Sequence, residues 1–175
     1  MRTAIGLFLE RESAEDAIDA LDEAGFGPDE VSVLARREVV EDIVDDERGE
    51  SAMESASVGA LGGTALGGLV GLIAGASALV VPGIGPALAF GTWATVLGTT
   101  AAGAGIGAAY GGIVGALIGF GVAEEQTHIY VEGVQQGGIL LLVQPEDPAQ
   151  LQTAEKIMTM HEGRGVDIVE EPEDI

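Results

Sequence analysis

The N-terminal part of the chain changes from an alternating apolar pattern to a helical one and back again. Residues 5–9 carry apolar side chains at every second position, which predicts a β-strand. Residues 14–24 carry an apolar stripe at helical spacing, with Ser13 as the predicted N-cap and Gly25 as the predicted helix stop. Residues 31–34 are again rich in Val and Leu and predict a second strand. Together they predict a β-α-β unit.

The C-terminal part repeats the same order of patterns. A polar helix is predicted over residues 124–136, followed by a fully apolar strand over residues 139–143. Asp147 stands before a proline, which is typical of a helix N-terminus, and apolar positions at helical spacing follow over residues 151–161. Residues 166–169 predict a last strand. The C-terminal part therefore predicts an α-β-α-β unit.

The two units read as a degenerate internal repeat, because both contain strand, helix, glycine turn and strand in the same order. Two such units predict one four-stranded sheet with helices on one face, which is a ferredoxin-like α+β fold. The predicted organisation is an N-terminal β-α-β half (1–37), an acidic linker (38–54), an apolar insertion (55–123), a C-terminal α-β-α-β half (124–170) and an acidic tail (171–175).

The insertion contains no charged residue between positions 55 and 123 and carries two ladders of glycine at every fourth position. Glycine costs a soluble helix about 1 kcal/mol relative to alanine, so a ladder needs a compensating reason. Close approach of helix backbones is such a reason, and the GxxxG pattern is typical of associating membrane helices. The residues assigned to helix packing and oligomerisation in this glycine zipper are Gly59, Gly63, Gly67, Gly71, Gly75, Gly103, Gly107, Gly111, Gly115 and Gly119.

The insertion predicts a transmembrane-type helical hairpin that reverses at Pro82-Gly83-Ile84-Gly85-Pro86. The first arm, residues 57–81, is long enough to span a bilayer. The second arm, residues 87–122, is too long for one crossing, so residues 87–99 are interpreted as a re-entrant or interfacial piece. Both halves of one sheet must lie on one side of the membrane, which predicts two crossings. The few arginines before the first arm favour cytoplasmic termini in the cell membrane.

Composition narrows the classes of function. Lys+Arg number 7 against 29 Asp+Glu, and the formal net charge of −22 disfavours binding to nucleic acid. Such an acid excess with only one lysine is typical of proteins that work in a salt-rich cytoplasm, where salt screens the self-repulsion. The alternative is an acidic surface made for cations or a basic partner. The absence of cysteine excludes disulfides and thiolate chemistry.

Few residues suggest chemistry. Glu124, Glu125 and His128 have the spacing of a metal half-site, but a solvated first helical turn is the favoured interpretation. Tyr130 is interpreted as packing against the sheet, and His161 as a favourable residue at a helix C-terminus. No catalytic, cofactor-binding or metal-binding residue is assigned, no cofactor is expected, and no small-molecule substrate is identified.

Residues 119–143 resemble the general stress protein 17M-like family, also called low-temperature-induced or YflT-like proteins. The resemblance rests on an acidic turn, a tyrosine, a Glu-Gly-Val helix end and a Gly-Gly pair before an apolar strand, at Glu124, Glu125, Tyr130, Glu132, Gly133, Val134, Gly137 and Gly138. The N-terminal unit and the Pro-Gly-Ile-Gly-Pro turn are also similar to that family, whereas Ala123 stands where the family often has proline. The resemblance implies a stress-associated protein without defined catalytic residues.

These observations predict a non-enzymatic, stress-associated membrane protein that contacts lipid and homo-oligomerises through its glycine ladders. Two alternatives remain open. The first is an oligomeric channel or transporter component, although the insertion offers no charged residue to line an ion path. The second is a soluble α/β protein that self-assembles or senses a ligand, with the glycine ladders packed inside the assembly.

Overall fold

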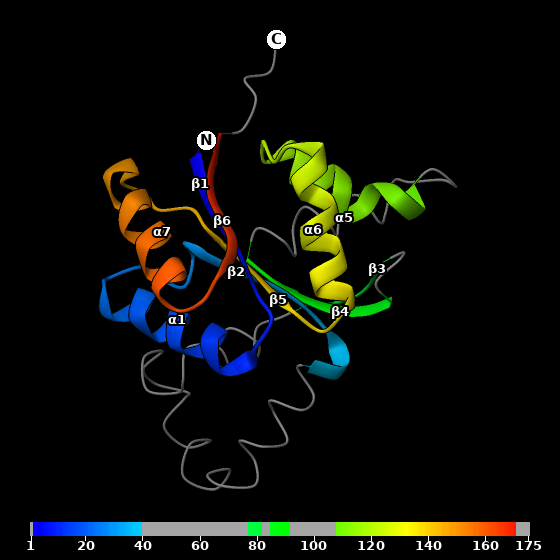
Figure 1. Ribbon diagram of the computed structural model, residues 1–175, viewed down its shortest axis with the longest axis horizontal. Coiled ribbons are helices and arrows are strands. Elements are labelled where there is room, and N and C mark those ends of the chain that lie inside the picture. Colours follow the sequence, from blue (N-terminus) through cyan, green and yellow to red (C-terminus); the bar gives the residue numbers. More distant parts are fainter. Residues whose placement is uncertain (1, 40–76, 82–84, 92–107, 171–175) are drawn as a thin grey trace, which may run out of the picture.

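The computed structural model describes residues 2–39, 77–81, 85–91 and 108–170, which form an α+β domain with one antiparallel sheet between two layers of helices (Figure 1). This confirms the predicted α+β class. In chain order the elements are β1 (Arg2–Phe8), α1 (Arg11–Glu23), β2 (Val31–Arg36), β3 (Ser77–Val81), β4 (Gly85–Phe90), α5 (Ala108–Gly119), α6 (Glu124–Gln135), β5 (Ile139–Val143), the 3-10 turn η1 (Pro148–Gln150), α7 (Leu151–Met160) and β6 (Arg164–Glu170).

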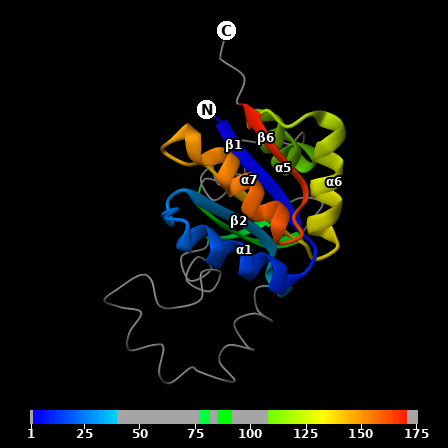
Figure 2. The ribbon, with the colours of Figure 1, turned by 60° about the vertical axis from the view of Figure 1, so that its left-hand side comes forward.

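The two β-α-β units interleave within the sheet. Among the described residues the strand order is β3-β4-β2-β5-β1-β6, and every neighbouring pair is antiparallel. Strand β5 lies between β1 and β2, so α1 connects two strands that run in the same direction. Strand β1 lies between β5 and β6 in the same way, and α7 connects that second pair (Figure 2). Residues from the N-terminal and C-terminal parts of the chain therefore share one core.

Both faces of the sheet are covered, which corrects the expectation of helices on one face only. Helices α1 and α7 pack on one face, where Leu141 of β5 belongs to their apolar cluster. Helices α5 and α6 pack on the other face, with Leu140 and Leu142. All five side chains of β5 are buried because the strand lies in the middle of the sheet and between the two helix layers. This position explains why β5 lacks the alternation of a half-exposed strand.

The helical hairpin predicted for the insertion is wrong at residues 77–81 and 85–90, which form strands, whereas residues 108–119 of the predicted second arm are helical. Residues 77–81, expected in the first helical arm, form β3, and residues 87–90, expected in the re-entrant piece, belong to β4. The reversal predicted between them is confirmed, since β3 and β4 are antiparallel and only residues 82–84 separate Val81 from Gly85. Strand β4 pairs with β2, from Val33↔Phe90 to Arg36↔Ala87. Backbone groups of β2 that would otherwise lie on a sheet edge thus obtain partners, which favours strands over helices here.

The rest of the predicted hairpin falls mostly outside the described residues, including all of the insertion from 55 to 76 and from 92 to 107. Within the second arm, residues 87–91 and 108–122 are described, and α5 is their helical part. None of the helices in the described part of the chain is both long and apolar enough to cross a bilayer.

The helix ends follow the expected chemistry with one exception. Helix α1 begins at Arg11 after Glu10, without a side-chain cap, so the predicted cap at Ser13 is wrong. A contact one turn apart, 2.6 Å from Arg11 Nε to Glu15 Oε1, stabilises the first turn instead. Gly25 follows the helix with φ of 91°, as expected for a helix stop. The carboxylate of Asp147 accepts a hydrogen bond from the Ala149 N–H and confirms the predicted cap there.

Candidate functional site

Helix α5 places the last two glycines of the second ladder, Gly115 and Gly119, on the surface of the described domain. The helix is apolar throughout and packs against α6 and β3. Its inward side is formed by residues spaced three and four apart, as expected for one helical face, and all of them are buried. They are Ile113, Ala116, Leu117 and Phe120. These side chains join the cluster between α5, α6 and the sheet, so the orientation of α5 is set by its own core contacts.

The opposite side of α5 carries the glycines. Gly115 and Gly119 are exposed, and Ile118 between them is 43% exposed. A Cβ atom built on either glycine would meet no atom of the described residues within 4 Å. Neither glycine therefore has a packing reason among the residues that the structure describes, although glycine inside a helix costs about 1 kcal/mol relative to alanine. The exposed residues Gly115, Ile118 and Gly119 are called the α5 face below.

Other glycines are required by the fold, which makes the α5 face distinctive. A Cβ on Gly121 would overlap the carbonyl oxygen of Glu170, and its φ is 91°. A Cβ on Gly133 of α6 would overlap the side chain of Leu7. Neither clash exists at Gly115 or Gly119. The sequence pattern alone does not separate these two kinds of glycine, because the difference lies in which neighbours the folded chain brings close.

One further residue of the predicted ladders lies among the described residues. Gly111 is in α5, in the same helix as Gly115 and Gly119. The others fall outside the described residues: Gly59, Gly63, Gly67, Gly71, Gly75, Gly103 and Gly107. Ile118 was not among the predicted site residues. Its position three residues after Gly115 was the available signal, because residues three apart lie on one helix face.

The candidate metal half-site is an exposed helix start. Glu124 and Glu125 lie in the first turn of α6, and both are exposed, as is His128. No group of three or more His, Asp or Glu side chains that could hold a metal ion occurs in the described parts of the chain. The two carboxylates stand where acidic residues are favoured by the helix dipole.

Tyr130 is a packing residue, as predicted from the sequence. It lies on α6, is 1% exposed, and its hydroxyl donates a hydrogen bond to the backbone carbonyl of Gly165 on β6. Burial, together with the negative charge of Asp167, raises the pKa of Tyr130 to about 12. Asp167 also accepts a long hydrogen bond, 3.4 Å, from the Gln126 side chain on α6. These groups attach α6 to the last strand.

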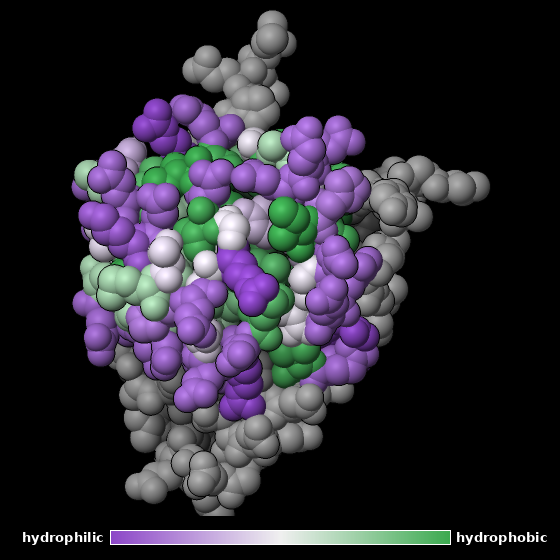
Figure 3. Space-filling model, viewed as in Figure 1, coloured by the Kyte–Doolittle hydropathy of each residue, from purple (hydrophilic) through white to green (hydrophobic). Residues whose placement is uncertain are grey.

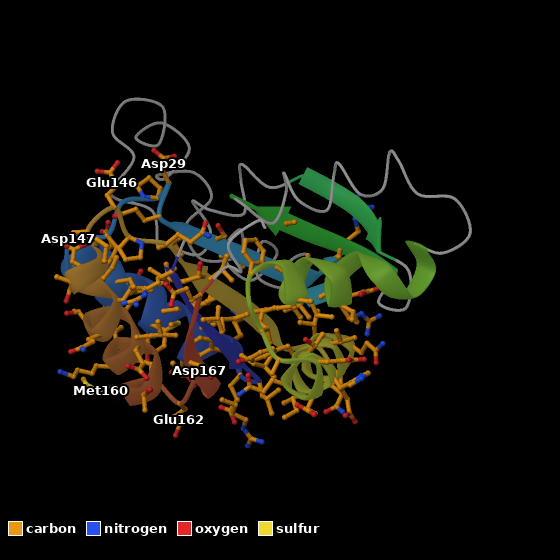
Figure 4. All side chains as sticks on the ribbon, turned by 90° about the horizontal axis from the view of Figure 1, so that it is seen from above. Asp29, Glu146, Asp147, Met160, Glu162 and Asp167 are labelled. Atoms are coloured by element: carbon orange, nitrogen blue, oxygen red, sulfur yellow. The ribbon has the colours of Figure 1, made fainter. Side chains whose placement is uncertain are left out.

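A second polar cluster, around Glu30, joins the turn before β2 to the loop between β5 and α7. Glu30 accepts hydrogen bonds from the backbone N–H groups of Gly27 (2.8 Å) and Glu146 (2.7 Å), and its own carbonyl accepts one from the Gln144 N–H (2.7 Å). Asp29, Glu146 and Asp147 lie at the same corner of the domain (Figure 4). The Glu30 carboxylate thus holds the loop between β5 and α7 in place, a role that no sequence pattern predicts.

The comparisons with known proteins bring no relative to this chain. No protein-family model, no curated protein and no solved structure matches it significantly.

Proposed function

We propose that this protein is a non-enzymatic, stress-associated membrane protein that homo-oligomerises through its glycine-ladder helices. The observation that carries the proposal is the α5 face. Two glycines and a half-exposed isoleucine lie together on a helix whose other side is buried in the core. Small residues on a helix allow a second helix to approach closely, and an exposed apolar residue beside them gains from being covered.

The charge distribution supports contact between copies at this face. A net charge of −22 makes two copies repel one another over most of their surface. The view of Figure 3 shows how hydrophilic residues cover much of the domain outside its apolar patches. Residues 55–123, which include all of α5, carry no charge. Two copies can therefore associate through α5 without placing like charges close together.

The mass of the protein in solution tests the oligomer. A Cβ atom at Gly115 meets no described atom within 4 Å, so we expect Gly115→Leu to fold, to fill the α5 face and to reduce the assembly measured by light scattering in molar salt. Gln152→Leu places the same side chain on an exposed position of α7 and serves as the control. An unchanged mass for Gly115→Leu, or a monomeric wild-type protein, overturns this part of the proposal.

The membrane part of the proposal rests on the uncharged residues 55–76 and 92–107, the first of which contain the whole first glycine ladder. We propose that they contact lipid in the cell membrane, with both termini on the cytoplasmic side. Alkaline-carbonate extraction of membranes from expressing cells tests this. Retention in the pellet, with release only by detergent, is the expected result, and recovery in the supernatant contradicts it.

One observation favours a second candidate, a soluble protein that assembles through the same face. Strands β3 and β4 and helix α5 all come from the uncharged region. The two strands belong to the sheet, and the helix packs against it. The extraction experiment separates the two candidates. A discrete oligomer in the supernatant supports the soluble assembly, while the Gly115→Leu result decides the interface in either case.

We also propose that residues 2–36 and 139–170 form a ferredoxin-like unit, which the strand order β2-β5-β1-β6 supports. Membership of the 17M-like stress family is part of the same proposal and rests on the resemblance of residues 119–143. An increase of the protein after a shift in salt or temperature, measured by quantitative immunoblotting, tests the stress association. Constant abundance through such shifts argues against it.

A further inference from the structure

The two edges of the sheet are built differently. In the described residues β6 lies at one end of the strand order and β3 at the other. An edge strand presents backbone N–H and C=O groups that can pair with another chain, and proteins protect such edges with charges, bulges or covering elements.

The β6 edge is protected in several ways. The carboxylate of Asp167, within the strand, accepts a hydrogen bond from the Ile168 N–H (2.8 Å). The Gly165 carbonyl is bonded to the Tyr130 hydroxyl. The pairing with β1 shifts register between Ile5 and Leu7, which marks an irregularity of the kind that ends regular pairing. Figure 4 shows β6 at the margin of the domain, between α7 and α6. A second strand therefore finds charge and occupied backbone groups there.

The β3 edge has none of these protections among the described residues. Its pairing with β4 is regular over five residue pairs, from Ser77↔Ala89 to Val81↔Gly85. The strand contains no charged residue and no proline. It also lies in the uncharged region between residues 55 and 123, whereas the chain as a whole carries a net charge of −22. A regular, neutral edge strand on an otherwise acidic protein is the place where backbone pairing meets the least repulsion.

We propose that the outer edge of β3 pairs antiparallel with β3 of a second copy of this chain, which joins two sheets into one. We favour a second copy as the partner for two reasons. The neutral strand has no charged group to attract a charged partner, and a two-fold axis lets the same edge serve both copies. This contact is separate from the α5 face, since it uses backbone groups at the end of the sheet. It therefore extends the proposed self-association to a second interface.

The absence of cysteine from the chain makes a cross-linking test direct. Antiparallel pairs have Cα atoms about 4.5–5.5 Å apart, which suits a disulfide. Paired residues lie on the same face of a sheet, so in a symmetric pair one residue faces itself. We expect one of three variants, Ala78→Cys, Leu79→Cys or Val80→Cys, to form an oxidised dimer, while Arg164→Cys on the protected β6 edge does not.

The same variants are oxidised with and without Gly115→Leu. A disulfide dimer in both backgrounds supports the β3 contact whatever happens at α5, and no dimer from any of the three positions overturns it. Equal cross-linking from Arg164→Cys also overturns it, because the reaction is then random collision. Hydrogen exchange of the wild-type protein is a check that needs no variant. The β3 amides are expected to become more protected as concentration rises, and exchange independent of concentration contradicts the proposal.

Discussion

Gly133 of α6 lies against Leu7 of β1 so closely that no methyl group fits between them. A Cβ atom on Gly133 would overlap one methyl of Leu7 and lie 2.9 Å from the other. Leu7 is 2% exposed and belongs to the cluster between the sheet and α6. A side chain at position 133 therefore requires Leu7 or α6 to shift from its present place.

Gly133→Ala should destabilise the protein, because the new methyl forces Leu7 or α6 to move. We expect a loss of about 1–3 kcal/mol in the free energy of unfolding, the usual cost of overpacking, reduced in part by the better helix propensity of alanine. Denaturant unfolding measures it. Gly115→Ala is the matched control, since the same change on the open side of α5 should stabilise a dilute protomer by about 1 kcal/mol. Two equal effects would contradict the assigned contacts.

Tyr130→Phe should lower the free energy of unfolding by about 0.5–1.5 kcal/mol at neutral pH, the typical net value of one hydrogen bond. It should also change the alkaline response. The folded state raises the pKa of Tyr130 from 10.0 to about 12, so the native protein holds this proton more tightly than the unfolded chain. Its contribution to stability is present below pH 10 and is lost as the pH rises toward 12.

Urea unfolding of the wild-type protein and of Tyr130→Phe at several pH values between 8 and 12 (about the range of the titration) separates the two effects. The stability difference between the two proteins should shrink above pH 10, because only the wild-type protein loses this term. A difference that stays constant over that range would show that Tyr130 titrates alike in both states.

Glu162→Gly should stabilise the protein by about 1 kcal/mol. Glu162 follows helix α7 with φ of 64°, the only non-glycine residue with positive φ in the described part of the chain. Glycine adopts this conformation without the steric cost of a Cβ atom. The change removes the exposed hydrogen bond from the Ser13 hydroxyl to the Glu162 carboxylate, which is 3.4 Å long.

The melting temperature checks this prediction, and Ser13→Ala is the control that removes the same contact and leaves the backbone unchanged. We expect Ser13→Ala to be nearly neutral. A lower melting temperature for Glu162→Gly than for Ser13→Ala would contradict the assigned strain.

Much of the domain could be predicted because its local signals agree. The apolar run of residues 139–143, the cap at Asp147 and the stop at Gly25 all mark elements found in the structure. The same apolar run also indicates helices on both faces of the sheet, because a strand without alternation is buried on both faces. The second helix layer follows from it.

The insertion could not be predicted in the same way. Short apolar segments such as residues 77–81 suit a buried helix and a strand equally well by periodicity, and the decision comes from the partner that β2 needs at its edge. The two kinds of glycine are separated only by distant contacts, such as that between Gly133 and Leu7. The exposure of Ile118 likewise depends on which side of α5 packs against the sheet.

The most direct test of self-association through the α5 face is sedimentation equilibrium of the wild-type protein and of Gly115→Leu in molar salt, over a wide range of concentrations. We predict that the variant dissociates at a concentration at least about tenfold higher than the wild-type protein, which corresponds to about 1.4 kcal/mol. Equal dissociation constants for the two proteins, or a wild-type protein that stays monomeric at every concentration, would contradict the assignment of the α5 face as an interface.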